Sequence, residues 1–238
     1  MKVLFAGPSL FGQDFDAAGL VVRPPARQGD IHRALLDGAD AIGLVDGVFG
    51  FVPSVWHKEI LFALSQGVRV LGGASLGALR AAECRAYGME PVGEIATAYA
   101  SGVRFEDADV CLAHAPGELD FMPLSEPLVD VEASVARLLD LGLLDAAQAW
   151  RWLHAARDLY FADRTVEAML EAAALPAALG AEYRRHRVGV KARDALALIK
   201  RLQALPEGRG EAPVGWTFQD SGPWRAYLAT FGHVPDMA

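Results

Sequence analysis

Short apolar runs alternate with helix-like segments through the first half of the chain. Runs rich in β-forming residues occupy 3–6, 20–22, 41–45 and 68–71, and each is followed by glycine, proline or aspartate. Helical spacing follows an expected N-cap at Asp30, and it recurs at 55–65 and 76–87. A further strand is expected at 109–113. Because strands that alternate with helices build parallel sheets, we predict an α/β fold with a mostly parallel sheet and flanking helices.

The pattern becomes helical in the second half of the chain. Ala, Leu, Arg and Glu dominate residues 131–204 at helical spacing, which predicts four or five helices. Trp216, Trp224 and Tyr227 then mark an aromatic tail that we expect to dock on the body of the protein or on a partner. We therefore predict an α/β core domain at 1–130, a helical region at 131–205, and a loop with an aromatic C-terminal tail at 206–238.

Composition and charge narrow the class of protein. The chain has 238 residues, of which 53% are hydrophobic, so it can bury a substantial core without disulfides. A net charge of −8 argues against a nucleic-acid surface, and no apolar run is long enough to span a bilayer. The start of the sequence is too short for a signal peptide. We expect a cytoplasmic protein that binds neither nucleic acid nor membrane, with Cys84 and Cys111 as buried free thiols.

Two stretches resemble ligand sites but fit them poorly. Residues 7–12 follow the first strand, but Ser9 stands where a dinucleotide loop needs a glycine, and Pro8 removes a backbone donor. The acidic residues at 106–109, together with His114, match no standard metal-ligand spacing. We expect a structural turn and a solvated loop at these places, and neither a metal nor an organic cofactor.

The most specific chemical signal is GASLG at residues 73–77, between a predicted strand and a predicted helix. It matches the nucleophile elbow G-x-S-x-G, in which a sharp turn exposes the serine hydroxyl. Ser75 is then the nucleophile, and the backbone N–H of Leu76 faces an oxyanion. Candidates for oxyanion or substrate binding are Leu76, Gly77, Asp46 and Arg80. The alternative is that Ser75 only caps the following helix.

A serine nucleophile needs a base, and His57 and Lys58 begin the helix before it. Apolar neighbours and the positive end of a helix disfavour the ammonium form of Lys58, which favours a neutral amine within hydrogen-bond reach of Ser75. His57, with an acid such as Asp46, is the other candidate base. It also stays open that Lys58 and Glu59 extend into solvent, that His57 has no catalytic role, and that Arg80 and Glu83 form an i,i+3 pair.

Taken together, these motifs resemble the TfuA-like family over roughly residues 1–130. The stretches that carry the likeness are GPSL at 7–10, PPARQGDI at 24–31, IGLVDGVF at 42–49, HKEILFAL at 57–64, GASLGALRAAE at 73–83, YGMEPVGEI at 87–95, FEDADVCLAH at 105–114 and SEPLVD at 125–130. The block around Ser75 is the most specific. Leu76 and Ala108 depart from the methionine and the acidic residue expected there.

The resemblance implies that the protein acts together with a YcaO enzyme. Such an enzyme activates a peptide amide with ATP so that sulfur replaces the amide oxygen. The TfuA-like partner is thought to hydrolyse the C-terminal thiocarboxylate of a ThiS-like sulfur carrier and so supply sulfide for thioamidation of ribosomally made peptides. Carried over, the catalytic serine is Ser75 and the lysine is Lys58, and no cofactor is expected. His57 stays a further candidate catalytic residue, as the base or in support of Lys58. Two alternatives are a non-catalytic adaptor that recruits carrier and peptide, and a serine hydrolase of small esters.

Overall fold

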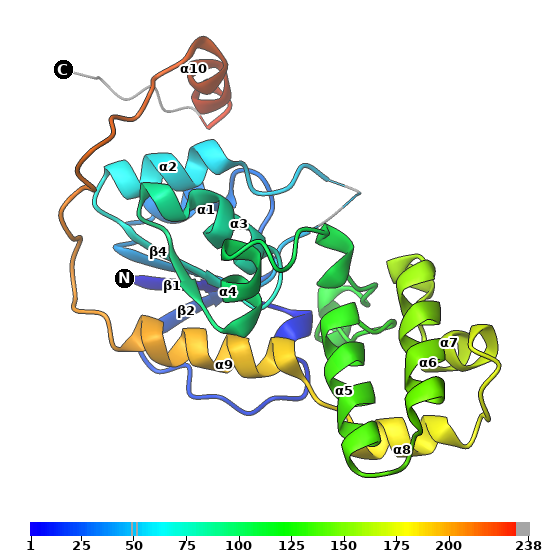
Figure 1. Ribbon diagram of the computed structural model, residues 1–238. Coiled ribbons are helices and arrows are strands. Elements are labelled where there is room, and N and C mark those ends of the chain that lie inside the picture. Colours follow the sequence, from blue (N-terminus) through cyan, green and yellow to red (C-terminus); the bar gives the residue numbers. More distant parts are fainter. Residues whose placement is uncertain (49, 51, 232–238) are drawn as a thin grey trace.

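The computed structural model describes residues 1–48, 50 and 52–231 (Figure 1). Its sheet consists of β1 (Lys2–Phe5), β2 (Leu20–Arg23), β3 (Ala41–Leu44), β4 (Arg69–Gly73) and β5 (Glu90–Val92). The strand order is β2-β1-β3-β4-β5, and each neighbouring pair is parallel. The predicted α/β fold with a parallel sheet, flanking helices and a helical C-terminal region is confirmed.

Four of the predicted strands form, but the one predicted at 109–113 is wrong. Asp107–Asp109 is a short 3-10 helix (η3), and the segment 110–113 joins no strand of the sheet. The fifth strand is β5, which pairs with the end of β4. Pro91 in its centre cannot donate to a ladder, and an edge strand is where a sheet tolerates this. The short, proline-containing sequence therefore gave no strand signal.

Helices cover both faces of the sheet. Those that follow the strands in the core are α1 (Asp30–Leu36), α2 (His57–Ser65), α3 (Leu76–Cys84), which continues into the 3-10 turn η2 (Arg85–Tyr87), and α4 (Glu94–Ala100). Val3 and Phe5 of β1 face the cluster that holds α1 and α2, while Leu4 faces the opposite side. This alternation is what a strand buried on both faces requires. No helix in the described ranges is long and apolar enough to cross a membrane.

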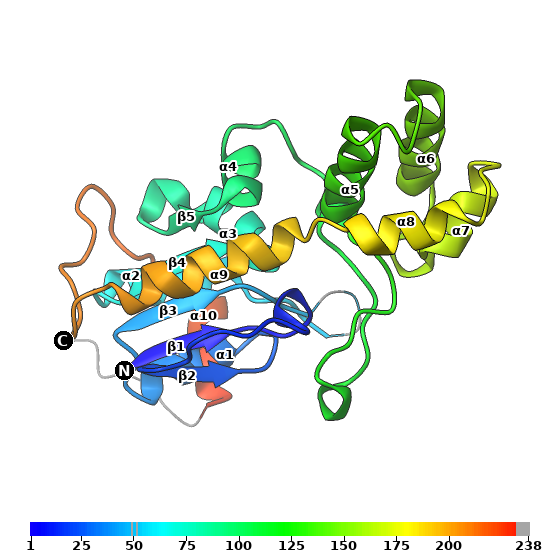
Figure 2. The same ribbon diagram turned by 90° about the horizontal axis from the view of Figure 1, so that it is seen from below.

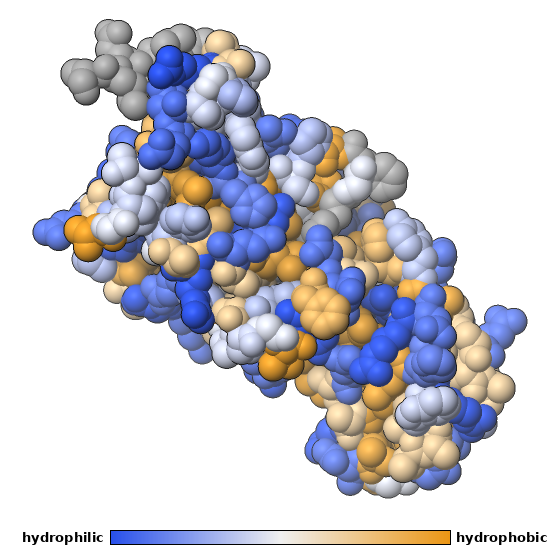
Figure 3. Space-filling model, turned by 45° about the horizontal axis from the view of Figure 1, so that its top comes forward, coloured by the Kyte–Doolittle hydropathy of each residue, from blue (hydrophilic) through white to orange (hydrophobic). Residues whose placement is uncertain are grey.

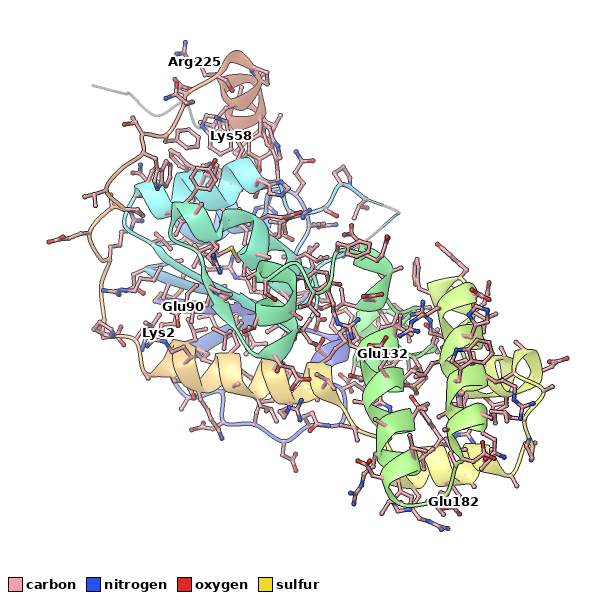
Figure 4. The ribbon with its side chains drawn as sticks, viewed as in Figure 1. Lys2, Lys58, Glu90, Glu132, Glu182 and Arg225 are labelled. Carbon is pink, nitrogen blue, oxygen red and sulfur yellow. The ribbon has the colours of Figure 1, made fainter. Side chains whose placement is uncertain are left out.

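Helix α9 (Val190–Gln203) lies on the opposite face from α10 (Gly222–Ala229), as Figures 1 and 2 both show. Leu198 and Leu202 pack against Leu4, and a Cβ at Gly43 would lie 2.7 Å from Leu198, so glycine allows the helix to approach β3. At the far end of α9, the Lys2 amine donates to the Gln203 carbonyl at 2.7 Å (Figure 4). Lys2 begins β1, so the last turn of α9 lies at the amino ends of the strands and its first turn lies near their carboxyl ends.

Four helices pack around a second core beside the sheet (Figure 1). They are α5 (Leu128–Asp140), α6 (Ala146–Asp158), α7 (Val166–Ala172) and α8 (Leu179–His186), with a 3-10 turn η5 (Phe161–Asp163) between α6 and α7. Trp152 and Tyr183 stack in this core with ring centroids 5.5 Å apart. Together with α9, these helices confirm the prediction of four or five helices over 131–204. We call α5–α8, with η5, the helical region.

Residues 206–231, here the C-terminal arm, return across the α1–α2 side of the core (Figure 1). Trp224 in α10 is buried, and its ring lies 5.1 Å from that of Phe62 in α2. Trp216 packs against Tyr87 with centroids 5.5 Å apart. The prediction that the aromatic tail docks on the body of the protein is confirmed for the described part of this tail.

Glu59 is buried in the first turn of α2, which excludes the idea that it extends into solvent. Its carboxylate accepts hydrogen bonds from the N–H groups of Gly29 (2.9 Å) and His32 (3.3 Å) at the start of α1. Glu59 thus supplies the cap that we predicted for Asp30, which is instead the first residue of the helix after the N-cap Gly29. Burial raises the pKa of Glu59, and these bonds oppose the rise.

Candidate active site

Ser75 lies in the turn that joins β4 to α3, and it is 4% exposed. The preceding Ala74 has a φ of 62°, in the left-handed region that residues with a Cβ rarely adopt. Such strain is found where the surrounding structure fixes a functional turn. Ser75 occupies the N-cap position of α3, but its side chain makes no capping hydrogen bond. The alternative that Ser75 serves only as a helix cap therefore lacks the bond that defines a cap.

Gly77 lets this turn pack tightly against β3. A Cβ at Gly77 would lie 1.7 Å from the carbonyl oxygen of Leu44, so no other residue fits there. The Gly77 N–H donates to the carbonyl of Val45 at 3.1 Å. Since that N–H is engaged, we assign Gly77 to packing of the turn rather than to the oxyanion.

Ser75 lines a cavity of about 320 Å³ between the α/β core and the helical region. The walls come from the loops after β1 and β3, from the segment 110–114, and from the turn at 160–162. Lining residues with polar side chains are Asp46, Ser75, Cys111, His114, Tyr160 and Lys191. The cavity lies at the carboxyl ends of the strands, where parallel α/β sheets bind their ligands.

Lys191 is the lysine of this cavity. It lies in the first turn of α9 and is 3% exposed. Its Nζ donates to the carbonyl of Val110 at 2.8 Å, and its backbone N–H donates to the Asp130 carboxylate at 3.1 Å. Burial lowers the pKa of Lys191, and the charges of Asp46 and Asp130 oppose this only in part. The ammonium form of Lys191 is therefore less favoured than that of a lysine in water, and this amine lies in the cavity that Ser75 also lines.

Asp46 holds the loop after β1 against the cavity. Its carboxylate accepts bonds from the N–H groups of Gly7 (2.8 Å) and Ser9 (3.0 Å) and from the Ser9 hydroxyl (2.6 Å). The stretch 7–12 is thus a structural turn, with a 3-10 helix (η1) at Pro8–Leu10. Asp46 faces the cavity but does not pair with His57, the partner considered for it from the sequence.

His57 begins α2 and Arg80 lies in α3, and both contact Glu83 near the end of α3. His57 Nε2 is 2.8 Å from the Glu83 carboxylate, which Arg80 Nη1 also contacts at 2.8 Å. Arg80 Nε donates to the carbonyl of Val55 at 3.0 Å. The Arg80–Glu83 pair, which the sequence left open, forms within α3, and the contact between His57 and Glu83 joins α2 to α3. Neither His57 nor Arg80 lines the cavity, so the structure gives both residues packing contacts instead of a place near Ser75.

Lys58 contacts the C-terminal arm. Its Nζ donates to the carbonyl of Gln219 and lies 4.5 Å from the centroid of the Phe218 ring. Figure 4 shows Lys58 beside α10, on the side of the core opposite α9. Lys58 does not line the Ser75 cavity, and the expected hydrogen bond between Ser75 and Lys58 is not formed. The lysine that lines the same cavity as Ser75 is Lys191 instead.

The model of one protein family, described as TfuA-like protein, matches residues 46–165. The chain belongs to the TfuA-like family. This family is associated with YcaO-dependent thioamidation, and membership implies a YcaO partner. A search of curated proteins found no match. The matched segment of this TfuA-like protein includes Ser75 and most of the residues that line the cavity. Lys191 lies beyond the matched segment, and its place at the cavity comes from the structure alone.

Two backbone N–H groups of the TfuA-like protein are available beside Ser75. Within the described ranges, the N–H groups of Leu76 and Gly47 have no protein acceptor. Gly47 lines the cavity in the loop after β3, the strand next to β4. A Cβ at Gly47 would lie 1.9 Å from Leu76 Cδ2 and 3.0 Å from the Ala26 carbonyl oxygen, so a side chain there would displace the Leu76 side chain. Leu76 was predicted as a donor, whereas nothing in the sequence around Gly47 pointed to it.

The segment 110–114 is part of the cavity wall. It includes His114, which was predicted to lie in a solvated loop with the acidic residues at 106–109, whereas 106–108 are exposed. Cys111 is buried, as predicted for both cysteines, and burial raises its pKa to about 11. His114 Nδ1 lies 2.8 Å from the carbonyl of Ala115, which can only accept, so the neutral ring carries its proton on Nδ1. Across the described residues, no group of three or more His, Cys, Asp or Glu side chains could hold a metal ion.

A sequence signal for Lys191 exists in retrospect. It stands one helical turn before Asp194 and Ala195, on the stripe that continues through Leu198 and Leu202, all of them buried. A lysine on a buried stripe is unusual, because burying an ammonium costs several kcal/mol in the absence of a partner. The helix was recognised from its spacing, but the lysine on its buried side was not singled out.

Proposed function

We propose that this TfuA-like protein hydrolyses the C-terminal thiocarboxylate of a ThiS-like carrier and supplies the sulfide to a YcaO enzyme. Ser75 is the nucleophile, and Lys191 is the base. The observation that carries the proposal is the shared cavity, in which a serine without a capping bond and a lysine with a lowered pKa both line the wall. A serine with a lysine base is an established variant of the catalytic triad.

Acylation begins with the neutral Lys191 amine, which accepts the proton of the Ser75 hydroxyl. The serine oxygen attacks the thiocarboxylate carbon and forms a tetrahedral intermediate. The N–H groups of Leu76 and Gly47 stabilise the negative oxygen of this intermediate. The carbon–sulfur bond then breaks, the Lys191 ammonium returns its proton to the departing sulfur, and hydrosulfide leaves. The carrier is now joined to Ser75 as an ester.

Deacylation reuses the same lysine. Water attacks the ester carbonyl while the Lys191 amine accepts its proton, and that proton passes to the Ser75 oxygen as the ester bond breaks. The carrier leaves as a carboxylate and releases one proton to solvent. Each turnover thus converts one thiocarboxylate and one water into one carboxylate, one hydrosulfide and one proton, with no redox step.

The proposal is tested by sulfide release from a thiocarboxylated ThiS-like carrier. Replacement of Ser75 by alanine should lower the rate by about 10³-fold or more, because nucleophile and base act as a unit. Full sulfide release by Ser75→Ala would contradict the proposal. If Ser75→Ala also supports normal thioamidation by the YcaO enzyme, the protein acts as an adaptor. Rapid hydrolysis of simple esters without any action on the carrier would indicate a small-ester hydrolase.

A further inference from the structure

The cavity has one wall that does not belong to the α/β core. Tyr160, Phe161 and Ala162, between α6 and α7, line it opposite the loops that follow β1 and β3. Tyr160 lines the cavity, yet its side chain is 63% exposed. It therefore lies at the rim, whereas Ser75 and Lys191, which line other parts of the cavity, are buried. On the face shown in Figure 3, hydrophobic residues interrupt the hydrophilic surface where the core meets the helical region.

A buried arginine fixes the turn that carries Tyr160. Arg164 is 2% exposed, and its guanidinium donates to the carbonyls of Ala156 at 2.7 Å and Ala108 at 3.2 Å. The Arg164 carbonyl in turn accepts the N–H of Glu126 at 2.8 Å. These bonds tie the turn to the segment before the cavity wall and to the entry of α5. A rim fixed in this way presents its side chain at a defined place.

The Tyr160 side chain has the properties of a recognition residue. Its ring packs on that of Phe161 with centroids 4.4 Å apart, which limits its freedom at little entropic cost. Its hydroxyl makes no hydrogen bond to any of the described residues and is free to bind a ligand. Tyrosine is one of the residue types enriched among those that dominate binding energy at protein interfaces.

The site distinguishes ligands by how far they extend. An acyl group on Ser75 is buried, so a two-carbon acid occupies only the inner part of the cavity. The terminal segment of a protein must pass from Ser75 over the rim to reach the body of that protein. Resting on the function proposed above, we propose that Tyr160 is a specificity-determining residue that binds the extended C-terminal segment of the protein carrier. The helical region thereby selects a protein-bound thiocarboxylate over a free one.

The test compares two substrates, a thiocarboxylated ThiS-like carrier and thioacetate. For Tyr160→Ala, KM for the carrier should rise about tenfold while kcat changes less than about twofold, because the rim contact is uniform in ground and transition states. Its activity on thioacetate should stay at the wild-type level. Tyr160→Phe keeps the ring and should lose less affinity than Tyr160→Ala. An equal loss on both substrates would show a structural role and overturn the proposal, as would an unchanged KM for the carrier.

Phe105 offers a matched control, since it is an exposed aromatic residue (78%) that lines a neighbouring groove but not the cavity. Phe105→Ala should leave the KM and kcat for both substrates unchanged. A tenfold rise in its KM for the carrier would show that exposed aromatic residues outside the cavity contribute as much to binding as Tyr160 does, which would contradict the proposal.

A binding measurement separates this inference from the proposed reaction. Carrier in its carboxylate form should bind Ser75→Ala about tenfold more tightly than the Ser75→Ala, Tyr160→Ala double variant. Equal Kd values would overturn the inference even if sulfide release is normal.

Discussion

Helices α2 and α9 each carry a lysine in the first turn, but the two lysines have opposite surroundings. Lys58 in α2 reaches outward to the C-terminal arm, where it binds the Gln219 carbonyl and the face of Phe218. Lys191 in α9 is buried at the cavity, where it binds the Val110 carbonyl near the Asp46 and Asp130 carboxylates. The sequence around Lys58 suggested a base, whereas the structure gives the surroundings of a base to Lys191.

The difference between the two lysines shows that burial, and not position on a helix alone, lowers the pKa of a lysine side chain. Both lysines have apolar neighbours along their helices and lie at the positive end of a helix dipole. Lys58 stays partly exposed beside the C-terminal arm, whereas Lys191 is 3% exposed, and this burial lowers the pKa of Lys191. A lysine becomes a usable base through tertiary burial, which the spacing of one helix does not reveal.

The largest expected effect is a loss of activity on replacing Lys191. Lys191→Met keeps the length of the side chain but removes the amine, and it should lower sulfide release about 10³-fold, as loss of a triad member does. Lys58→Met is the matched control and should retain activity within about twofold, since it removes a surface hydrogen bond and a cation–π contact. Steady-state assays on thiocarboxylated carrier test both variants. The reverse order of activities would restore the assignment made from the sequence.

The second expected effect is on stability and concerns the side of the core that holds Lys58. Trp224→Ala removes a fully buried indole from the contact between α10 and α2, and it should lower the free energy of unfolding by about 3–5 kcal/mol. Urea unfolding measures this loss. Sulfide release well below the unfolding midpoint should stay near the wild-type rate, because the arm lies away from the cavity. A specific loss of kcat in fully folded Trp224→Ala would show that the arm takes part in the reaction.

A smaller effect should follow from the charge of Asp46. Its carboxylate favours the Lys191 ammonium, so Asp46→Asn should lower the pKa of Lys191 further. The reaction needs the neutral amine, and activity rises with pH through that pKa. The rising limb of the pH–kcat profile should therefore move to lower pH. A shift to higher pH, or none, would contradict the proposed coupling.

Asp194 provides the control for this comparison. It is a buried carboxylate on α9 that accepts the Ile95 N–H at 2.8 Å and does not line the cavity. Asp46→Asn and Asp194→Asn should each cost roughly 1–3 kcal/mol of stability, because each weakens buried hydrogen bonds. Only Asp46→Asn should move the pH profile. An equal shift in both variants would indicate a general effect of destabilisation.

Local sequence was sufficient to predict the first four strands and the turn that carries Ser75. The runs at 3–6, 20–22, 41–45 and 68–71 gave the first four strands, because β-rich residues end there at turn formers. GASLG gave the turn at Ser75, since small residues next to a strand and a helix are a local requirement of that geometry. In these cases a local pattern of residue types was enough to locate the element.

Contacts between distant segments were beyond the reach of pattern reasoning. Lys191 and Ser75 are 116 positions apart, and they share a cavity only because α9 returns to the sheet after the helical region. Glu59 caps α1 from another helix, so the local candidate Asp30 was chosen in its place. Strand β5 was missed because it is only a tripeptide and contains proline. Each of these features depends on tertiary packing that no single window of sequence encodes.

Chemical rescue of Lys191→Ala tests most directly whether the amine at the start of α9 is the base. Truncation to alanine leaves room in the cavity, which methylamine can enter. Sulfide release from thioacetate should be nearly absent in this variant. It should return as methylamine is added, and in proportion to the neutral fraction of that amine as the pH is varied. Failure of amines to restore activity, in a Lys191→Ala variant that remains folded while Lys58→Ala proves inactive, would contradict the account.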